Sequence, residues 1–271
     1  MMRSLWTAAS GMIAQQTNVD SIANNLANVN TTGYKAEKVE FKTLLYQTIQ
    51  ARTTTANGEQ KPIPAQVGLG TRVVATTTDF DQGAMLANSS DTAFAIDGKG
   101  FFAVRAEDGN IYYTRNGDFK WSIGPEGTTL CNSAGYPVLD SEGNTIVVPD
   151  GVKTSSVKVT SDGEFTYKND AGQNVTFGNG IGLFQFNNPA GLDKLAGSLY
   201  TETAASGQAM NEATTNGLVR SDIYQNYLEG SNVQLADEMV NLIVAQRAYE
   251  MNSKAIQASD EMLGQANQLR R

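Results

Sequence analysis

The sequence predicts an α+β protein in which long N- and C-terminal helices form a coiled coil and flank a central, antiparallel β-rich domain. Residues that break helices are confined to the middle of the chain. All six prolines lie between Pro62 and Pro189, and only Gly11, Gly33 and Gly264 of the 26 glycines fall outside 58–230. Both ends carry apolar residues at helical spacing, whereas the middle alternates β-branched runs with turn pairs.

The first helix is expected from about Ser4 to Asn28. Its apolar row repeats at seven-residue intervals and consists of Leu5, Met12, Val19 and Leu26, widened by Ile22. Gly33 follows Thr31 and Thr32 and can take the left-handed conformation that ends a helix. Arg3 and Asp20 are the only charged residues in 1–30, so this helix lacks the charged face of an ordinary surface helix. We therefore expect it to be covered on more than one side.

The last helix is expected from about Asn232 to Leu269, with Ser231 or Asn232 as its N-cap. Its row consists of Leu235, Leu242, Tyr249, Ile256 and Leu263, with Met239 beside it. One such helix could simply pack on its own globular core. Two of them at opposite ends, both poor in charge, favour an antiparallel coiled coil that also contacts neighbouring copies.

The middle of the chain predicts an antiparallel sandwich or open barrel. Its expected strands are Thr71–Phe80, Ala93–Arg105, Ile111–Phe119, Thr145–Val148, Val157–Thr160, Glu164–Tyr167 and Ile181–Phe186. Pairs such as Asp108-Gly109 and Asp162-Gly163 lie between these runs and are strong hairpin signals. Glycine-rich segments such as Gly98-x-Gly100 lack the spacing of a nucleotide-binding loop and are consistent with hairpin turns.

These boundaries predict four regions. They are an N-terminal helix (1–35), an extended connector (36–80), a β-rich domain (81–220) and a C-terminal helical region (221–271). Within the connector, residues 47–66 are rich in Thr, Gln and Ala and contain Pro62 and Pro64. We expect that insertion to be extended or partly ordered.

Composition excludes several functions. The chain has no histidine, one cysteine (Cys131) and a net charge of −8. Histidine-based catalysis, histidine or multi-thiolate metal sites and binding to a nucleic-acid backbone are therefore not expected. No apolar run reaches the length of a membrane span, and Leu5–Ala14 makes a poor signal peptide. We expect no enzyme activity, no cofactor, no metal and no membrane insertion.

Three parts of the sequence resemble the corresponding parts of the bacterial flagellar rod and hook protein family. They are Ser4–Met12 with Asp20–Lys35, Ala95–Phe102 with Tyr113–Phe119, and Glu238–Ala255. The family motif near the N-terminus is represented by Asn24, Asn25, Leu26, Ala27, Asn28, Gly33 and Tyr34. Within the family, Leu44–Ile49 and Val67–Val73 are most similar to distal rod subunits. Proximal rod and hook proteins, and a secreted oligomeric adhesin or binding module, remain as alternatives.

This resemblance implies a structural role in the basal body. Family members place both terminal helices in an inner layer around a channel, and their copies stack helically into a hollow, rigid shaft. That shaft transmits motor torque to the hook and lets exported subunits pass. The implied partners are further copies, proximal rod proteins, the hook protein, the outer-membrane and peptidoglycan bushing rings, and the type III export apparatus. The implied location is extracytoplasmic, reached without a cleaved signal peptide, and segment 47–66 is implied to bridge neighbouring subunits.

Overall fold

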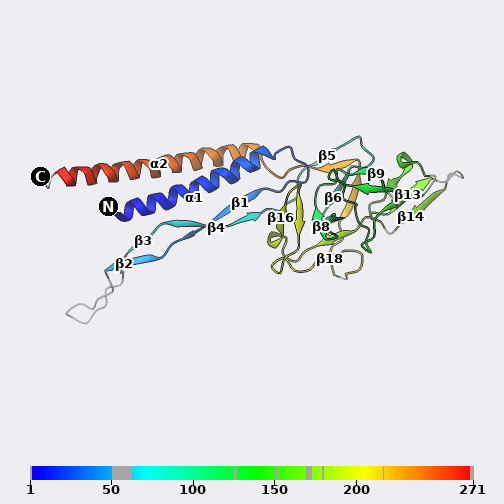
Figure 1. The fold of residues 1–271 in the computed structure, drawn as a ribbon, viewed down its shortest axis with the longest axis horizontal. Coiled ribbons are helices and arrows are strands. Elements are labelled where there is room, and N and C mark those ends of the chain that lie inside the picture. The colour runs from blue at the N-terminus through cyan, green and yellow to red at the C-terminus, as the bar shows by residue number, and fades with distance from the viewer. Residues whose placement is uncertain are drawn as a thin grey trace. The chain divides into compact units, whose positions relative to one another are not determined.

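The computed structural model describes residues 2–50, 63–124, 127–149, 152–168, 173–178, 180–215 and 217–268. The chain divides into two compact units. The helical unit comprises residues 1–27, 37–78 and 234–271, and the β unit comprises residues 28–36 and 79–233. Each unit is built from segments that are far apart in the sequence (Figure 1).

Two long helices dominate the helical unit. Helix α1 spans Met2–Ala27 and helix α2 spans Leu235–Gln268. They run antiparallel and side by side (Figure 1). Both expected helices are confirmed, with ends within three residues of the prediction. Asp237 and Glu238 lie in the first turn of α2, where carboxylates interact favourably with the helix dipole. Neither helix is both long and apolar enough to cross a lipid bilayer.

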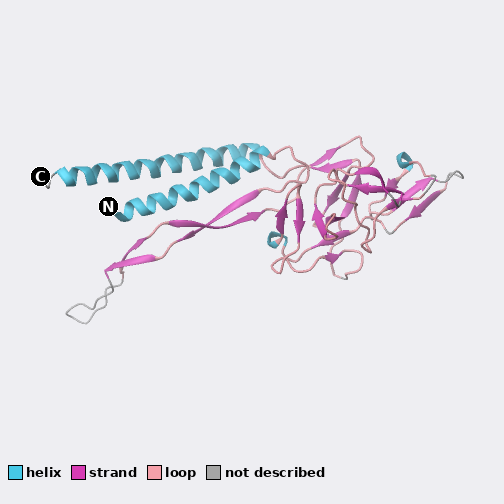
Figure 2. Ribbon diagram, viewed as in Figure 1, coloured by secondary structure: helices cyan, strands magenta, loops and turns pink. Residues whose placement is uncertain are grey.

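The other described residues of the helical unit form a β-ribbon (Figure 2). Strand β1 (Glu37–Thr43) pairs antiparallel with β4 (Thr71–Thr78), and β2 (Tyr46–Gln50) pairs antiparallel with β3 (Ala65–Gly68). The strand expected at 71–80 is confirmed, but the connector was not expected to pair with itself. Its strands are short and mostly polar, so their sequence resembles a linker. Residues 51–62 of the 47–66 insertion lie outside the described residues.

The β unit contains a six-stranded antiparallel sheet in the order β16-β17-β8-β7-β15-β18. Smaller sheets comprise β11-β10-β9, β12-β13-β14, β19-β6 and β20-β5. The strands are β5 (Met85–Ala87), β6 (Phe94–Asp97), β7 (Phe101–Arg105), β8 (Ile111–Thr114), β9 (Lys120–Gly124), β10 (Gly127–Cys131), β11 (Val147–Val148), β12 (Lys158–Val159), β13 (Phe165–Lys168), β14 (Asn174–Phe177), β15 (Leu183–Gln185), β16 (Asp193–Leu195), β17 (Leu199–Thr201), β18 (Met210–Asn211), β19 (Asp222–Gln225) and β20 (Tyr227–Glu229). Two 3₁₀ turns, Thr154–Ser156 and Pro189–Gly191, complete it.

Several expected strands are shorter or divided. The run 93–105 forms β6 and β7, because Gly98 has a φ of +139° and interrupts the ladder. The run 111–119 keeps a strand only in β8, and Asn116 and Gly117 after it have no regular secondary structure. The Asp108-Gly109 signal is confirmed, since Gly109 takes a φ of +79° in the β7–β8 hairpin. Residues 222–229 form β19 and β20, whereas the sequence pattern groups them with the C-terminal helix.

Aromatic and branched side chains fill the core of the β unit. One buried cluster includes Phe94, Phe102 and Phe119, and a second includes Phe101 and Tyr200. The rings meet edge to face, as at Phe102 and Phe119, whose centroids lie 5.2 Å apart. Such pairs add about 0.5–1.5 kcal/mol to simple burial. Cys131 is buried in this unit, as expected of a small core residue.

Candidate functional site

Helices α1 and α2 contact each other in a regular register. The hydroxyls of Ser4 and Ser259 lie 3.2 Å apart, and the side chain of Asn252 packs directly over Gly11. Near the other end, Nδ2 of Asn25 donates to Oε1 of Glu238 at 3.2 Å. Each step of seven or fourteen residues up α1 corresponds to an equal step down α2. The same faces of the two helices therefore meet at every seventh residue along their shared length.

Small and polar residues form this contact, and the sequence pattern did not single them out. On α1 they occupy positions 4, 11, 18 and 25, one residue before the predicted apolar row. The same register places Asn18 opposite Ala245, which is 1% exposed. A search for small residues at seven-residue intervals could have found this row. Small side chains permit a close approach of the two backbones, and the larger residues are displaced to the sides of the contact.

The predicted apolar rows lie beside this contact. Ile22 is buried, and the other members on α1, which are Leu5, Met12, Val19 and Leu26, are half-buried. On α2, Leu242, Ile256 and Leu263 are half-buried, whereas Leu235, Met239 and Tyr249 are exposed. The structure thus brings together eight members of the two rows around the helix pair and leaves three at its surface.

Further large apolar side chains are exposed on the helical unit. Trp6 is 74% exposed on α1, Met251 is 70% exposed on α2 and Leu45 is 83% exposed on the ribbon. The other exposed members are Ile13, Phe41, Tyr46, Ile49, Ile63, Val67, Leu69, Val74, Val240, Ile243, Val244 and Met262. Monomeric soluble proteins rarely expose large apolar patches, and fifteen large apolar side chains are exposed among the described residues of this unit in addition to the three of the predicted rows. The arrangement is typical of a surface that another protein covers.

A groove opens between the two helices near their middle. Its lining residues are Gln16 and Val19 from α1 and Gln246, Tyr249 and Glu250 from α2, and its volume is about 390 Å³. Val19 and the Tyr249 ring contribute apolar surface, and the amide and carboxylate groups supply polar atoms. Nη1 of Arg247 donates to Oε2 of Glu250 at 2.9 Å, and both of these side chains are exposed.

Asn25 of the family motif joins three elements of the helical unit. Its Nδ2 donates to the backbone oxygen of Glu37 at 2.8 Å, and its Oδ1 accepts from the Glu37 amide at 2.9 Å. The side chain therefore pairs with the start of β1 as a neighbouring strand would. The same amide also contacts Glu238 of α2. Asn25 is 1% exposed, so these bonds are shielded from water.

The remaining motif residues have different surroundings. Asn24 and Ala27 are exposed on α1, and Oδ1 of Asn28 accepts from the Thr31 hydroxyl at 3.1 Å. Gly33 is buried with a φ of +67°, and a Cβ there would lie 2.6 Å from the backbone nitrogen of Asn116. Only glycine combines this conformation with so close an approach. The ring of Tyr34 lies 5.8 Å from the ammonium of Lys194.

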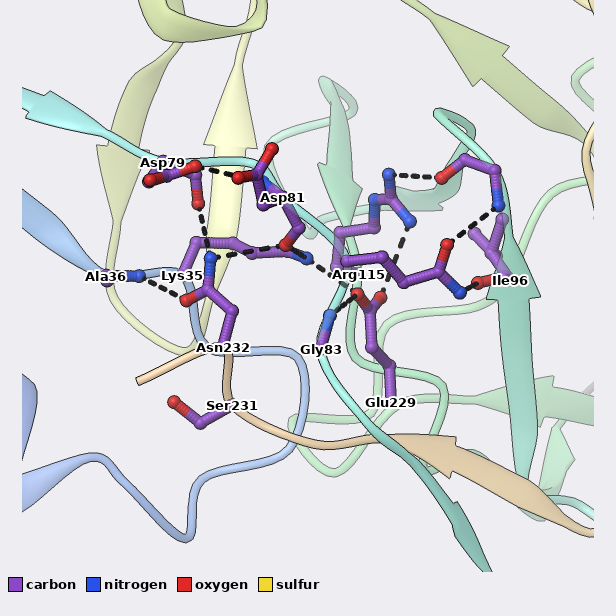
Figure 3. Close-up of polar contacts among 12 residues, drawn as sticks. Lys35, Ala36, Asp79, Asp81, Gly83, Ile96, Arg115, Glu229, Ser231 and Asn232 are labelled. Carbon is purple, nitrogen blue, oxygen red and sulfur yellow. Dashed lines mark hydrogen bonds and ion pairs between the residues drawn. The ribbon is translucent and has the colours of Figure 1, made fainter. Parts of the chain in front are cut away.

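The β unit contains a buried charge cluster formed by Lys35, Arg115 and Glu229 (Figure 3). Lys35 and Glu229 lie near the ends of the two segments that make up this unit. Glu229 is 1% exposed. Its carboxylate accepts a hydrogen bond from the Lys35 ammonium at 2.6 Å and from the Gly83 amide at 3.0 Å. It also accepts from Nη1 of Arg115 at 3.4 Å. Lys35 also donates to the backbone oxygen of Asp81 at 2.7 Å. The sequence analysis did not predict this cluster, although Lys35 and Arg115 both lie in stretches that resemble the family.

Burial sets the electrostatics of this cluster. It lowers the pKa of Lys35, although the Glu229 carboxylate favours the charged ammonium. Burial lowers the pKa of Arg115 as well, and Glu229 opposes that effect too. The Arg115 guanidinium also donates to the Gly98 oxygen at 2.8 Å and stacks 5.0 Å from the Phe101 ring. One carboxylate thus stabilises two buried cations, so its loss would leave both without their counter-charge.

Asn232 extends the cluster toward neighbouring backbone. Its Oδ1 accepts from the Ala36 amide at 2.7 Å, and its Nδ2 donates to the Asp79 oxygen at 2.9 Å (Figure 3). The Gly33 amide donates to the Glu229 oxygen at 2.8 Å. Segments 28–36, 79–83 and 229–233 are therefore held together by side chains whose bonds reach backbone groups. The cluster is a structural device, because its polar groups bond to one another and to the chain, with the buried Nε of Arg115 as the exception.

The described residues contain no group of three or more acidic, cysteine or histidine side chains that could hold a metal ion. A further buried carboxylate in the β unit is Glu212, which accepts from Gln185, from the Ser221 amide and from the Ser221 hydroxyl at 2.7–2.8 Å. These bonds fix the loop before β19. No arrangement of nucleophile and base emerges in the part of the chain that the structure describes.

Three family models match the chain. Residues 5–35 match the model described as flagella basal body rod protein, and residues 95–167 match the flagellar hook protein FlgE/F/G D1 domain. Residues 224–269 match the flagellar basal body rod FlgEFG protein C-terminal model. The first and last matches cover α1 and α2, and the middle match lies in the β unit.

Several proteins are similar to this chain over its whole length. The flagellar basal-body rod protein FlgG of Borreliella burgdorferi is 46% identical and covers 100% of both chains. FlgG of Bacillus subtilis is 38% identical, also over 100% of both chains. The flagellar hook-basal body complex protein FlhP of Bacillus subtilis is 30% identical over the same share.

Proposed function

The chain belongs to the family of flagellar basal-body rod proteins, and we propose that it is a structural subunit of the distal part of the rod. In this role its copies assemble helically into a hollow, rigid shaft that transmits torque and lets exported subunits pass. The observation that carries this proposal is the amount of large apolar side chain exposed on the helical unit. Its full-length similarity to FlgG proteins points to the same role.

Self-assembly follows from the physical character of the helical unit. Helix α1 carries only Arg3 and Asp20 as charged residues, so covering it with another helix desolvates little charge. Each large apolar side chain that becomes buried contributes about 1.5–3 kcal/mol. We propose that α1 and α2 form an antiparallel coiled coil within each copy, supported by their contacts at seven-residue steps. Outer faces of that pair would then pack against neighbouring copies.

The ribbon formed by β2 and β3 is proposed to bridge neighbouring copies. A two-stranded ribbon is marginally stable alone in water. Tyr46 and Ile49 of β2 are each 60% exposed, so their apolar surface is available to another chain. Contacts of this kind would stiffen the shaft. Deleting residues 47–66 should allow assembly but give filaments that bend more in electron micrographs. Straight, rigid filaments from that variant would contradict the bridging role.

Further partners are proposed from the family. They are the proximal rod proteins, the hook protein, the outer-membrane and peptidoglycan bushing rings, and the type III export apparatus. An extracytoplasmic place in the cell envelope follows from the same role. No step of it requires catalysis or a cofactor.

The decisive experiment replaces Leu242, a half-buried residue on α2. Leu242→Asp places an unpaired carboxylate where an apolar group packs, so we expect polymerisation to be lost while the β unit stays folded. Leu242→Met preserves size and apolarity and is the matched control. Electron microscopy measures polymer formation, and near-ultraviolet circular dichroism checks the β unit. Normal rods from Leu242→Asp would contradict the proposal.

A further inference from the structure

We propose that the groove between α1 and α2 receives the indole of Trp6 from α1 of the next copy. This inference rests on the proposed self-assembly and names one contact that would propagate it. The chain has two tryptophans. Trp121 packs against the core of the β unit, whereas Trp6 is 74% exposed. A large exposed indole on an almost uncharged helix has the character of a binding anchor.

The chemistry of the groove matches an indole. An indole has an apolar body and one N–H donor, and it usually finds a hydrogen-bond acceptor when buried. Val19 and the Tyr249 ring provide apolar surface, and Gln16, Gln246 and Glu250 provide amide and carboxylate oxygens as acceptors. The 390 Å³ volume lies within the range of pockets that bind small organic groups.

Within one copy, Trp6 cannot reach this groove. Trp6 and Val19 are on the same helix and lie about 20 Å apart along its axis at 1.5 Å per residue. The contact must therefore join different copies, with one copy displaced from the next by about that distance along the helix axis. Donor and acceptor surfaces are different patches, so the contact is head-to-tail and can repeat without closing. Open-ended repetition is what a shaft requires.

The exposed residues that follow Trp6 on α1 support a head-to-tail contact between copies. Ile13 is 67% exposed and lies seven residues after Trp6, so both residues share one face of the helix. Asp20, the next position in that series, is exposed and charged, which ends the apolar stripe. The stripe therefore covers only the N-terminal half of α1. The groove lies beyond it, around Val19.

The test measures the critical concentration for polymerisation of the full-length chain. Trp6→Ala removes the indole and should raise the critical concentration by about 30-fold, as expected for an interface anchor. Trp6→Phe keeps a ring but loses the N–H donor, and it should raise that concentration by a smaller factor of about 3–10. Circular dichroism of the dilute protein should be unchanged, because Trp6 is exposed within one copy.

A double-mutant cycle identifies the partner of Trp6. Tyr249→Ala should weaken assembly less in the Trp6→Ala background than in the parent, because the two side chains would share one contact. Met251→Ala is the matched control, since Met251 is an exposed apolar residue of α2 outside the groove. Its effect should be the same in both backgrounds. If Trp6→Ala stops polymerisation outright, Trp6→Leu takes its place in the cycle.

Fluorescence gives an independent readout. In a Trp121→Phe background, emission from Trp6 should shift to shorter wavelength as the protein polymerises. An unchanged critical concentration for Trp6→Ala, additive effects in the Tyr249 cycle or an unshifted emission would overturn the Trp6 contact. In each of these cases normal filaments would leave the rod function standing. Failure of the parent chain to polymerise would overturn both proposals.

Discussion

The two units of the molecule differ in how much of their apolar surface they bury. In the β unit, Phe94, Phe101 and Phe119 are at most 1% exposed, and even charged residues are drawn inside as the Glu229 cluster. In the helical unit, Trp6, Ile13 and Met251 are each at least 67% exposed. The β unit completes its core within one chain. The helical unit carries the surface that a neighbouring copy is proposed to complete.

The contrast predicts that a buried charge matters most in the β unit. Glu229→Gln should lower its free energy of unfolding by about 3–5 kcal/mol, because Lys35 and Arg115 would lose their counter-charge. Glu250→Gln is the matched control, since the Arg247–Glu250 pair is exposed and contributes at most about 0.5 kcal/mol. Urea unfolding measures both changes, followed by Trp121 fluorescence in a Trp6→Phe background for the β unit and by far-ultraviolet circular dichroism for the helices. Equal effects of the two substitutions would remove the distinction between the units.

A second substitution tests the close contact of the helices. Gly11→Leu inserts a side chain where a Cβ would already lie 2.9 Å from Nδ2 of Asn252. We expect the helical unit to lose about 1–3 kcal/mol and the β unit to be unaffected. Gly264→Leu is the matched control, because that position is open and leucine favours a helix over glycine by about 1 kcal/mol. Hydrogen exchange of α1 amides reports the result, and unchanged exchange would contradict the packing of this pair.

The smallest effect is expected from alkaline pH. Burial, with a smaller contribution from Glu202, raises the pKa of Tyr113 to about 12. Its pKa in the unfolded chain is about 10. The stabilisation is therefore fully present below about pH 10 and is lost as the pH rises toward 12. Tyr113→Phe should reduce the fall in unfolding free energy across this window, measured by urea unfolding. An identical fall in both proteins would exclude Tyr113 as its source.

Sequence alone predicted the elements with strong local signals. The apolar rows from Leu5 to Leu26 and from Leu235 to Leu263 located both helices, since a seven-residue spacing is visible within a short window. Strand β1 was missed because its alternation of charged and apolar residues is brief and its partner, β4, lies about thirty residues away along the chain.

Apart from the pairing of the two terminal helices, contacts between distant segments were not predicted. Lys35 and Glu229 are separated by 194 positions, and no local pattern marks either as a buried partner. The residues that form the close contact between the helices were missed for another reason. Apolar rows attract attention, whereas Ser4, Gly11 and Asn25 form a row of small and polar residues that only the pairing with α2 makes meaningful.

The pairing of Ser4 with Ser259 has a kinetic consequence. These residues are 255 positions apart, so their contact closes a loop that contains nearly the entire chain. Contacts between such remote positions are slow to form, because the entropy of closing the loop is lost before any contact compensates for it. The residues around Ser4 are synthesised long before those around Ser259 and must therefore wait before they can pair. Until α2 has been synthesised and has paired with it, α1 remains available to bind other proteins.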